Sequence, residues 1–141
     1  MIRRYLSVGA VLALVFGAAG TALAGGGQAI AFASVDGLST PTSPTIRAFG
    51  GSSTKSATVS LATPGSPGEV IVAFVGKFPK SITTNSVIPV ATAESNDFGV
   101  ANAYVVSASK TEIDVDVATW VSSNTATETA ENLFVTVYLG H

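Results

Sequence analysis

The sequence of 141 residues has no cysteine, one histidine and few charges, and each shortage excludes a class of protein. Without cysteine there is no disulfide scaffold, no cysteine-ligated zinc site and no cysteine nucleophile. The single histidine is His141, the last residue of the sequence. One histidine cannot form a histidine metal cluster, and at this position it could join a Ser-His-Asp triad within the chain only in a strained arrangement. A net charge of −2 excludes a generally basic nucleic-acid-binding protein. With 11% charged and 47% hydrophobic residues, the composition is not that of a disordered chain.

Residues 1–24 have the three parts of a secretory signal peptide. Arg3 and Arg4 give a positive start, an apolar run follows, and the small residues Ala22 and Ala24 suit a cleavage site. The apolar run is shorter than the roughly 20 residues of a membrane-spanning helix. We therefore expect cleavage after Ala24 and no stable membrane span afterwards, with an uncleaved anchor as the alternative. The protein is then secreted, periplasmic or on the cell surface.

Cleavage leaves residues 25–141 as one domain of 117 residues, with five basic and nine acidic groups and a net charge of −4. This part has 15 valines but only 4 leucines, and serine and threonine supply 15 residues each. Valine and threonine suit a pleated sheet better than a helix, and the scarcity of leucine counts against a helical core. We therefore predict an all-β domain, long enough to bury a core without disulfides.

Short alternating segments separated by turn residues indicate about eight strands. Asp36-Gly37 and residues 64–68 are turn signals, and Pro89 indicates an edge strand or a bulge. The predicted strands cover residues 29–35, 45–49, 56–62, 69–75, 82–93, 100–107, 111–119 and 133–139. This pattern predicts a single antiparallel β-sandwich of jelly-roll or immunoglobulin-like type, with a small β-barrel as the alternative.

An acidic stripe is the candidate metal site. Glu112, Asp114 and Asp116 alternate along the strand predicted at residues 111–119, so they share one face at intervals of about 7 Å. Calcium takes oxygen ligands of this kind. We favour the alternative of a solvated face that prevents edge-to-edge aggregation, because calcium sites usually draw their ligands from loops that wrap the ion. No other cofactor is predicted.

A second candidate site surrounds Trp120, which ends the same strand before a threonine-rich stretch at residues 122–131. An aromatic ring at the mouth of a loop can stack on the apolar face of a sugar. The predicted ligand-binding residues are therefore Trp120, Tyr104, Asn102 and Asp97. The alternative is that Trp120 closes one end of the core.

Pairs of carboxylates can support glycoside hydrolysis, and either the acidic stripe or Glu94 with Asp97 supplies such a pair. That chemistry needs a deep cleft, which a domain of this size rarely builds without long loops. No serine lies in a Gly-x-Ser-x-Gly nucleophile motif. We therefore expect no enzyme activity, and no catalytic residue is assigned.

Three stretches carry a resemblance to a known group of proteins: Ala-Phe-Ala-Ser-Val-Asp-Gly at residues 31–37, Phe-Pro-Lys at 78–80, and Phe-Val-Thr-Val at 134–137. With these stretches the chain resembles small exported bacterial β-sandwich proteins, similar in style to the domains at the tips of phage tail fibres. The resemblance implies recognition or a structural role, without catalytic residues.

Together these observations predict a secreted, non-enzymatic β-sandwich that acts in surface recognition or adhesion. Its partner is a glycan or a cell-surface protein, bound through the loops near Trp120. The alternative is a homo-oligomeric structural subunit of a filament or surface layer. Such a subunit would assemble by strand addition, donating residues 25–28 or the last strand to a neighbour. A small glycoside hydrolase is the least favoured function.

Overall fold

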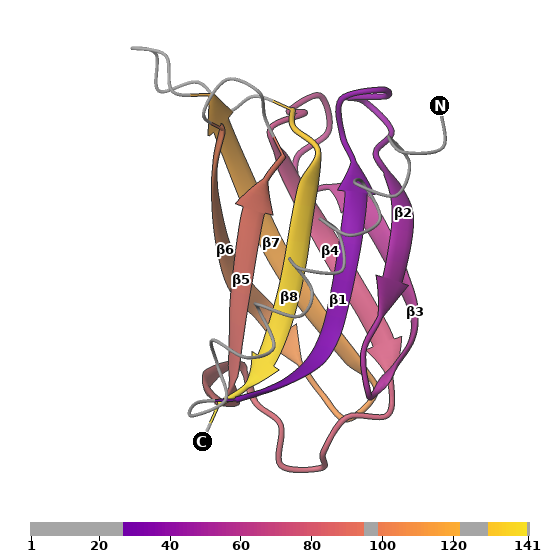
Figure 1. Ribbon diagram of the computed structural model, residues 1–141, viewed down its shortest axis with the longest axis vertical. Coiled ribbons are helices and arrows are strands. Elements are labelled where there is room, and N and C mark those ends of the chain that lie inside the picture. Colours follow the sequence, from indigo (N-terminus) through magenta and orange to yellow (C-terminus); the bar gives the residue numbers. More distant parts are fainter. Residues whose placement is uncertain (1–26, 95–98, 122–129, 141) are drawn as a thin grey trace, which may run out of the picture.

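The structure is a computed structural model that describes residues 27–94, 99–121 and 130–140, with the backbone alone for Trp120 and Val121. The predicted signal peptide, residues 1–24, lies outside these ranges. The described residues form eight strands and one short 3-10 helix (Figure 1). None of their helical structure is long and apolar enough to cross a membrane. The elements are β1 (Gln28–Asp36), β2 (Thr45–Gly50), β3 (Thr54–Leu61), β4 (Glu69–Gly76), η1 (Thr84–Ser86), β5 (Val87–Ala93), β6 (Gly99–Ala108), β7 (Glu112–Val121) and β8 (Leu133–Leu139).

The strands pair in two four-stranded antiparallel sheets, the first in the order β2-β1-β8-β5 and the second in the order β3-β4-β7-β6. The hairpins β1–β2, β3–β4 and β6–β7 each stay within one sheet, and the other connections cross between the sheets. As a result β2 and β3 are neighbours at one edge of the molecule, and β5 and β6 are neighbours at the other (Figure 1). This arrangement confirms the predicted all-β sandwich.

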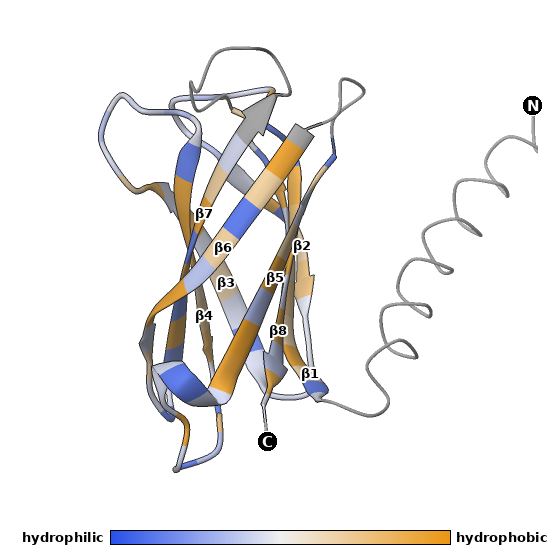
Figure 2. Cartoon of the chain, turned by 90° about the vertical axis from the view of Figure 1, so that its left-hand side faces the viewer, coloured by the Kyte–Doolittle hydropathy of each residue, from blue (hydrophilic) through white to orange (hydrophobic). Residues whose placement is uncertain are grey.

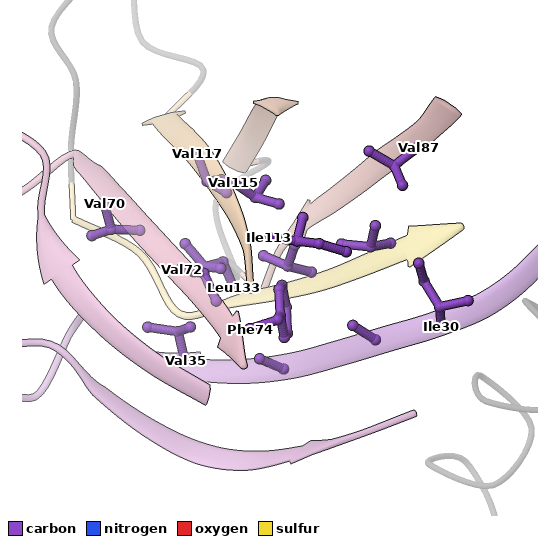
Figure 3. Close-up of a cluster of buried hydrophobic side chains, with 14 of the residues drawn as sticks. Ile30, Val35, Val70, Val72, Phe74, Val87, Ile113, Val115, Val117 and Leu133 are labelled. Atoms are coloured by element: carbon purple, nitrogen blue, oxygen red, sulfur yellow. The ribbon is translucent and has the colours of Figure 1, made fainter. Parts of the chain in front are cut away.

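The core lies between the two sheets and consists largely of β-branched side chains (Figure 3). Alternate residues of each inner strand point into it, as the period-two pattern predicts. Each valine or isoleucine that is fully buried contributes about 1.5–3 kcal/mol to stability. The largest fully buried hydrophobic side chains are Val35, Val72, Phe74, Ile113, Val115, Val117, Leu133, Val135 and Val137.

The strand predicted at residues 82–93 is shorter in the structure, because β5 begins only at Val87. The residues before it turn into η1, where local hydrogen bonds compete with sheet formation. The backbone N–H of Thr83 donates to Ser86 Oγ at 2.7 Å, and Ser86 Oγ donates to the Thr83 carbonyl at 2.9 Å. The prediction of a strand over residues 82–86 was therefore wrong.

Pro89 lies at a position of β5 whose backbone nitrogen does not face β8, so its missing N–H removes no hydrogen bond of the sheet. Strand β5 is an edge strand of the first sheet, which is one of the two alternatives that the proline indicated. The Ser86 carbonyl accepts a hydrogen bond from Gly140 N at 2.8 Å, and Glu94 N donates to the Asn132 carbonyl at 2.6 Å. Alternate residues between these two points bond to β8 in an antiparallel ladder, so the nitrogen of Pro89 faces the open edge.

A β-bulge in β1 allows hydrogen bonds that link the two sheets beside the β2–β3 connection. The pairing of β1 with β8 skips Ile30. The Ile30 carbonyl instead accepts hydrogen bonds from Ser53 N at 3.3 Å and from the Thr54 hydroxyl at 3.1 Å. The Ser53 carbonyl accepts a further bond from Lys77 N, just after β4, at 2.8 Å. Ser53 therefore connects the first sheet to the second.

Two glycines permit this close approach. A Cβ atom at Gly76 would lie 2.0 Å from the Ser53 carbonyl oxygen. Gly51 has a φ of 123°, a region that favours glycine, and a Cβ there would lie 2.4 Å from the Ile30 carbonyl oxygen. Any larger residue at either position would displace the connection.

We expect Gly76→Ala to lower the free energy of unfolding by about 2–3 kcal/mol, because the new methyl group overlaps the Ser53 backbone. Gly65→Ala is the matched control. Gly65 has a φ of 84°, but no described atom lies within 4 Å of an added Cβ, so its cost should be about 1 kcal/mol. Urea unfolding followed by circular dichroism measures both variants. Equal losses would show that Gly76 is not tightly packed.

Candidate functional site

The predicted site residues that the structure describes lie on the outer face of the second sheet. Tyr104 and Asn102 are exposed on β6, where they are opposite Asp116 and Ala118 of β7. The acidic stripe shares this face, because the alternate residues of β7 point into the core. The predicted ligand-binding and metal-binding residues are therefore neighbours on one surface.

A hydrogen bond between Tyr104 and Asp116 is the central contact of this surface. The Tyr104 hydroxyl donates to Asp116 Oδ2 at 2.8 Å. The side chain of Tyr104 is 56% exposed, whereas Asp116 is only 5% exposed. The hydrogen bond and the negative charge of Asp116 hold the phenolic proton and raise the pKa of Tyr104 above its ordinary value of 10.0. The bond thereby restricts an exposed aromatic ring.

The second carboxylate oxygen of Asp116, Oδ1, is buried and has no hydrogen-bond partner among the described residues. Ile71 of β4 is the register neighbour of Asp116 on the side away from Tyr104. Ile71 offers this carboxylate no side-chain donor, and a buried polar atom without a donor is costly. Asp116 therefore depends on the Tyr104 hydroxyl for its side-chain hydrogen bonding.

The other two carboxylates of the stripe have different surroundings. Asp114 Oδ2 accepts a hydrogen bond from Ser107 Oγ at 2.7 Å, and Glu112 is exposed at the start of β7. Alternate strand positions lie about 7 Å apart, whereas calcium needs several oxygens at about 2.3–2.6 Å. No group of three or more His, Cys, Asp or Glu in the described residues is placed to hold a metal ion. The calcium site stays a prediction to which this geometry adds no support.

Trp120 contributes its backbone to β7, where it is opposite Val100. Its side chain, Asp97 and residues 122–129 lie outside the described part of the chain. The described members of the predicted ligand-binding set are therefore Tyr104 and Asn102, two positions apart on one face of β6.

The carboxylates proposed for hydrolysis are not gathered at a described hollow. Glu94 pairs with Arg47, with Oε2 3.4 Å from Nη2. A hollow of about 340 Å³ lies elsewhere and has no charged residue in its lining. It is lined by Thr42, Ser43, Pro44, Val59, Ser60, Leu61 and Pro64.

An apolar patch covers the neighbouring edge strands β5 and β6. Five of the eight large hydrophobic side chains that are exposed in the described residues lie here, each 46–56% exposed. Figure 2 faces this side of the molecule and shows apolar segments along both strands. Exposed apolar side chains gathered on neighbouring strands are typical of interaction sites. We call it the β5–β6 patch, and it consists of Ile88, Val90, Val100, Tyr104 and Val106.

The two strands of the patch also have no charged residues. Across their combined seventeen positions, β5 and β6 have no Asp, Glu, Lys or Arg. The edge strands on the opposite side each carry a basic residue, Arg47 in β2 and Lys55 in β3. Charged side chains on an edge strand oppose association with another chain. With respect to charge, the β5–β6 edge is thus the less protected of the two.

Sequence reasoning missed this patch, although its signal was present in β6. Residues 100–104 alternate between larger and smaller side chains, and an alternating pattern does not say which face is inside. In the structure the smaller Ala101 and Ala103 pack against the core, whereas Val100 and Tyr104 face outward. The patch residues Val100 and Tyr104 are therefore the larger members of the alternation.

Comparison with known proteins gives no relative: no protein-family model, no curated protein and no solved structure matches this chain. The resemblance to small exported β-sandwich proteins and to phage tail-fibre tips stays a prediction. The function is therefore inferred from the surface itself.

We expect Tyr104 to ionise at a higher pH than an unperturbed tyrosine. Its pKa is raised in the folded protein, so the Tyr104–Asp116 interaction contributes stability below pH 10.0, which is lost as the pH rises through the folded-state pKa. Asp116→Asn removes the charge and should return the pKa of Tyr104 toward 10.0. An NMR titration of the Tyr104 ring measures this change.

Asp114→Asn is the control for that titration, because Asp114 bonds to Ser107 and not to Tyr104. It should leave the pKa of Tyr104 unchanged. The same pKa in wild type and Asp116→Asn would contradict the assignment.

Proposed function

We propose that the protein is an exported, non-enzymatic recognition domain that acts in adhesion by binding a partner through the β5–β6 patch. The observation that supports this is the patch itself, five exposed apolar side chains on two adjacent strands without charge. The export step rests on residues 1–24, which have the pattern of a signal peptide.

Tyr104 is the anchor of the proposed interface. Aromatic residues dominate binding energies because they bury a large area with few rotatable bonds. The hydrogen bond to Asp116 restricts the ring before any partner arrives, which lowers the entropic cost of binding. The ring and Asn102 suit a sugar, whereas the aliphatic neighbours Val100 and Val106 suit an apolar protein surface. The aliphatic majority of the patch favours a protein partner over a glycan.

A structural subunit of a filament or surface layer is the second candidate function. The lack of charge on β5 and β6 favours it, because charged side chains on edge strands oppose association with other chains. The hydrolase alternative has no comparable support, since Glu94 is paired with Arg47 and the described hollow has no charged residue in its lining.

We expect Tyr104→Ala to weaken binding to the envelope of the producing cells at least tenfold, because truncation removes the aromatic anchor. Binding of the purified protein to intact cells and to a glycan array measures the effect. Protease treatment of the cells distinguishes a protein partner, whose binding is lost, from a glycan, whose binding persists.

Phe49→Ala is the matched control, because Phe49 is also an exposed aromatic residue, 45% against 56% for Tyr104, and lies on β2 at the opposite edge. It should bind as wild type does. Wild-type binding by Tyr104→Ala, or an equal loss in Phe49→Ala, would refute the site.

A further inference from the structure

We infer that the partner of the β5–β6 patch is a second copy of this chain, packed about a two-fold axis. This inference rests on the proposed function, because it takes the patch to be an interaction surface. It names the occupant of that surface and makes the protein a closed dimer.

The absence of charge is the first reason for choosing a second copy. A two-fold contact sets the same surface of both copies against itself, so a charge near the axis meets its own like charge. Like charges in direct opposition destabilise a contact. The uncharged region includes β8, the neighbour of β5, so β8, β5 and β6 together have no charged residue over 24 positions.

The rest of the second sheet could not serve in this way. Strands β4 and β7 have four carboxylates and no basic residue: Glu69, Glu112, Asp114 and Asp116. Two such surfaces would repel each other. A foreign partner recognised through charge would bind there or at the basic residues of β2 and β3, and not at the uncharged strands β5 and β6.

The size of the patch is sufficient for a dimer. Strand β6 has 10 residues and is about 33 Å long. Strand β5 has 7 residues and is about 23 Å long, and each strand with its side chains is about 10 Å wide, which gives roughly 560 Å² for each copy. The total of about 1,100 Å² exceeds the roughly 1,000 Å² that a biological interface buries and corresponds to a reversible dimer.

The contact is made by side chains and not by strand addition. Pro89 removes a donor from the open edge of β5, and the pairing of β6 with β7 shifts register between Val105 and Ser107. Prolines and bulges of this kind prevent an edge from templating a further strand. The copies therefore close as a pair and do not extend into a filament.

Sedimentation velocity of the purified protein from 1 to 200 μM tests the inference, with the mature N-terminus identified by mass spectrometry. We expect a concentration-dependent dimer. Val90→Glu and Val90→Lys should each raise the dimer Kd at least tenfold, because each sets like charges near the axis. An equimolar mixture of the two variants should recover the dimer, which a foreign-partner surface would not predict.

Phe49→Glu places the same charge at an exposed aromatic position on the opposite edge and should leave the dimer intact. Circular dichroism of each variant verifies that it is folded. A monomer at 200 μM, an open polymer, or equal dissociation by Phe49→Glu would overturn the inference.

Each of the two proposals can be refuted while the other stands. If the wild type is a monomer but Tyr104→Ala still loses cell binding, the recognition function stands and the self-association falls. If the dimer forms and responds to Val90 charges while Tyr104→Ala binds cells normally, the self-association stands and the adhesion function falls.

Discussion

The packing of two inner sheet faces rich in β-branched residues is the constraint on which the remaining features of this protein depend. The cluster unites residues from both sheets, from the small Ala31 and Ala33 of β1 to the large Phe74 of β4, all fully buried. Because the inner faces must fit at close-packed density, each strand has one orientation available. The side chains that do not pack between the two sheets lie on the outer faces.

The candidate site follows from that constraint at the β5–β6 edge. The inner face of β6 accommodates Ala101 and Ala103, so the larger Val100 and Tyr104 of the same strand face outward. Register then sets Tyr104 opposite Asp116, and the hydrogen bond between them orients the exposed ring. An apolar surface that includes a restrained aromatic residue results from the way the core is filled.

Much of the local structure could be predicted from alternation and turn residues. The strand expected at residues 133–139 coincides with β8, and the one expected at 69–75 differs from β4 by a single residue. The prediction failed over residues 82–86, where Thr83 and Ser86 exchange short-range hydrogen bonds. In those residues a local polar contact outweighed the extended tendency of the segment.

The sequence by itself determined the all-β class, most of the strand positions, the placement of Pro89 at an edge or a bulge, and the shared face of the acidic stripe. These properties depend on composition and on a period of two, which are local. Only the tertiary structure decided that β5 and β6 are neighbours, that Asp116 is buried beside Tyr104, and that the larger residues of β6 face outward. Those features depend on pairing between segments far apart in the chain, and an alternating pattern does not specify its partner or its inner face.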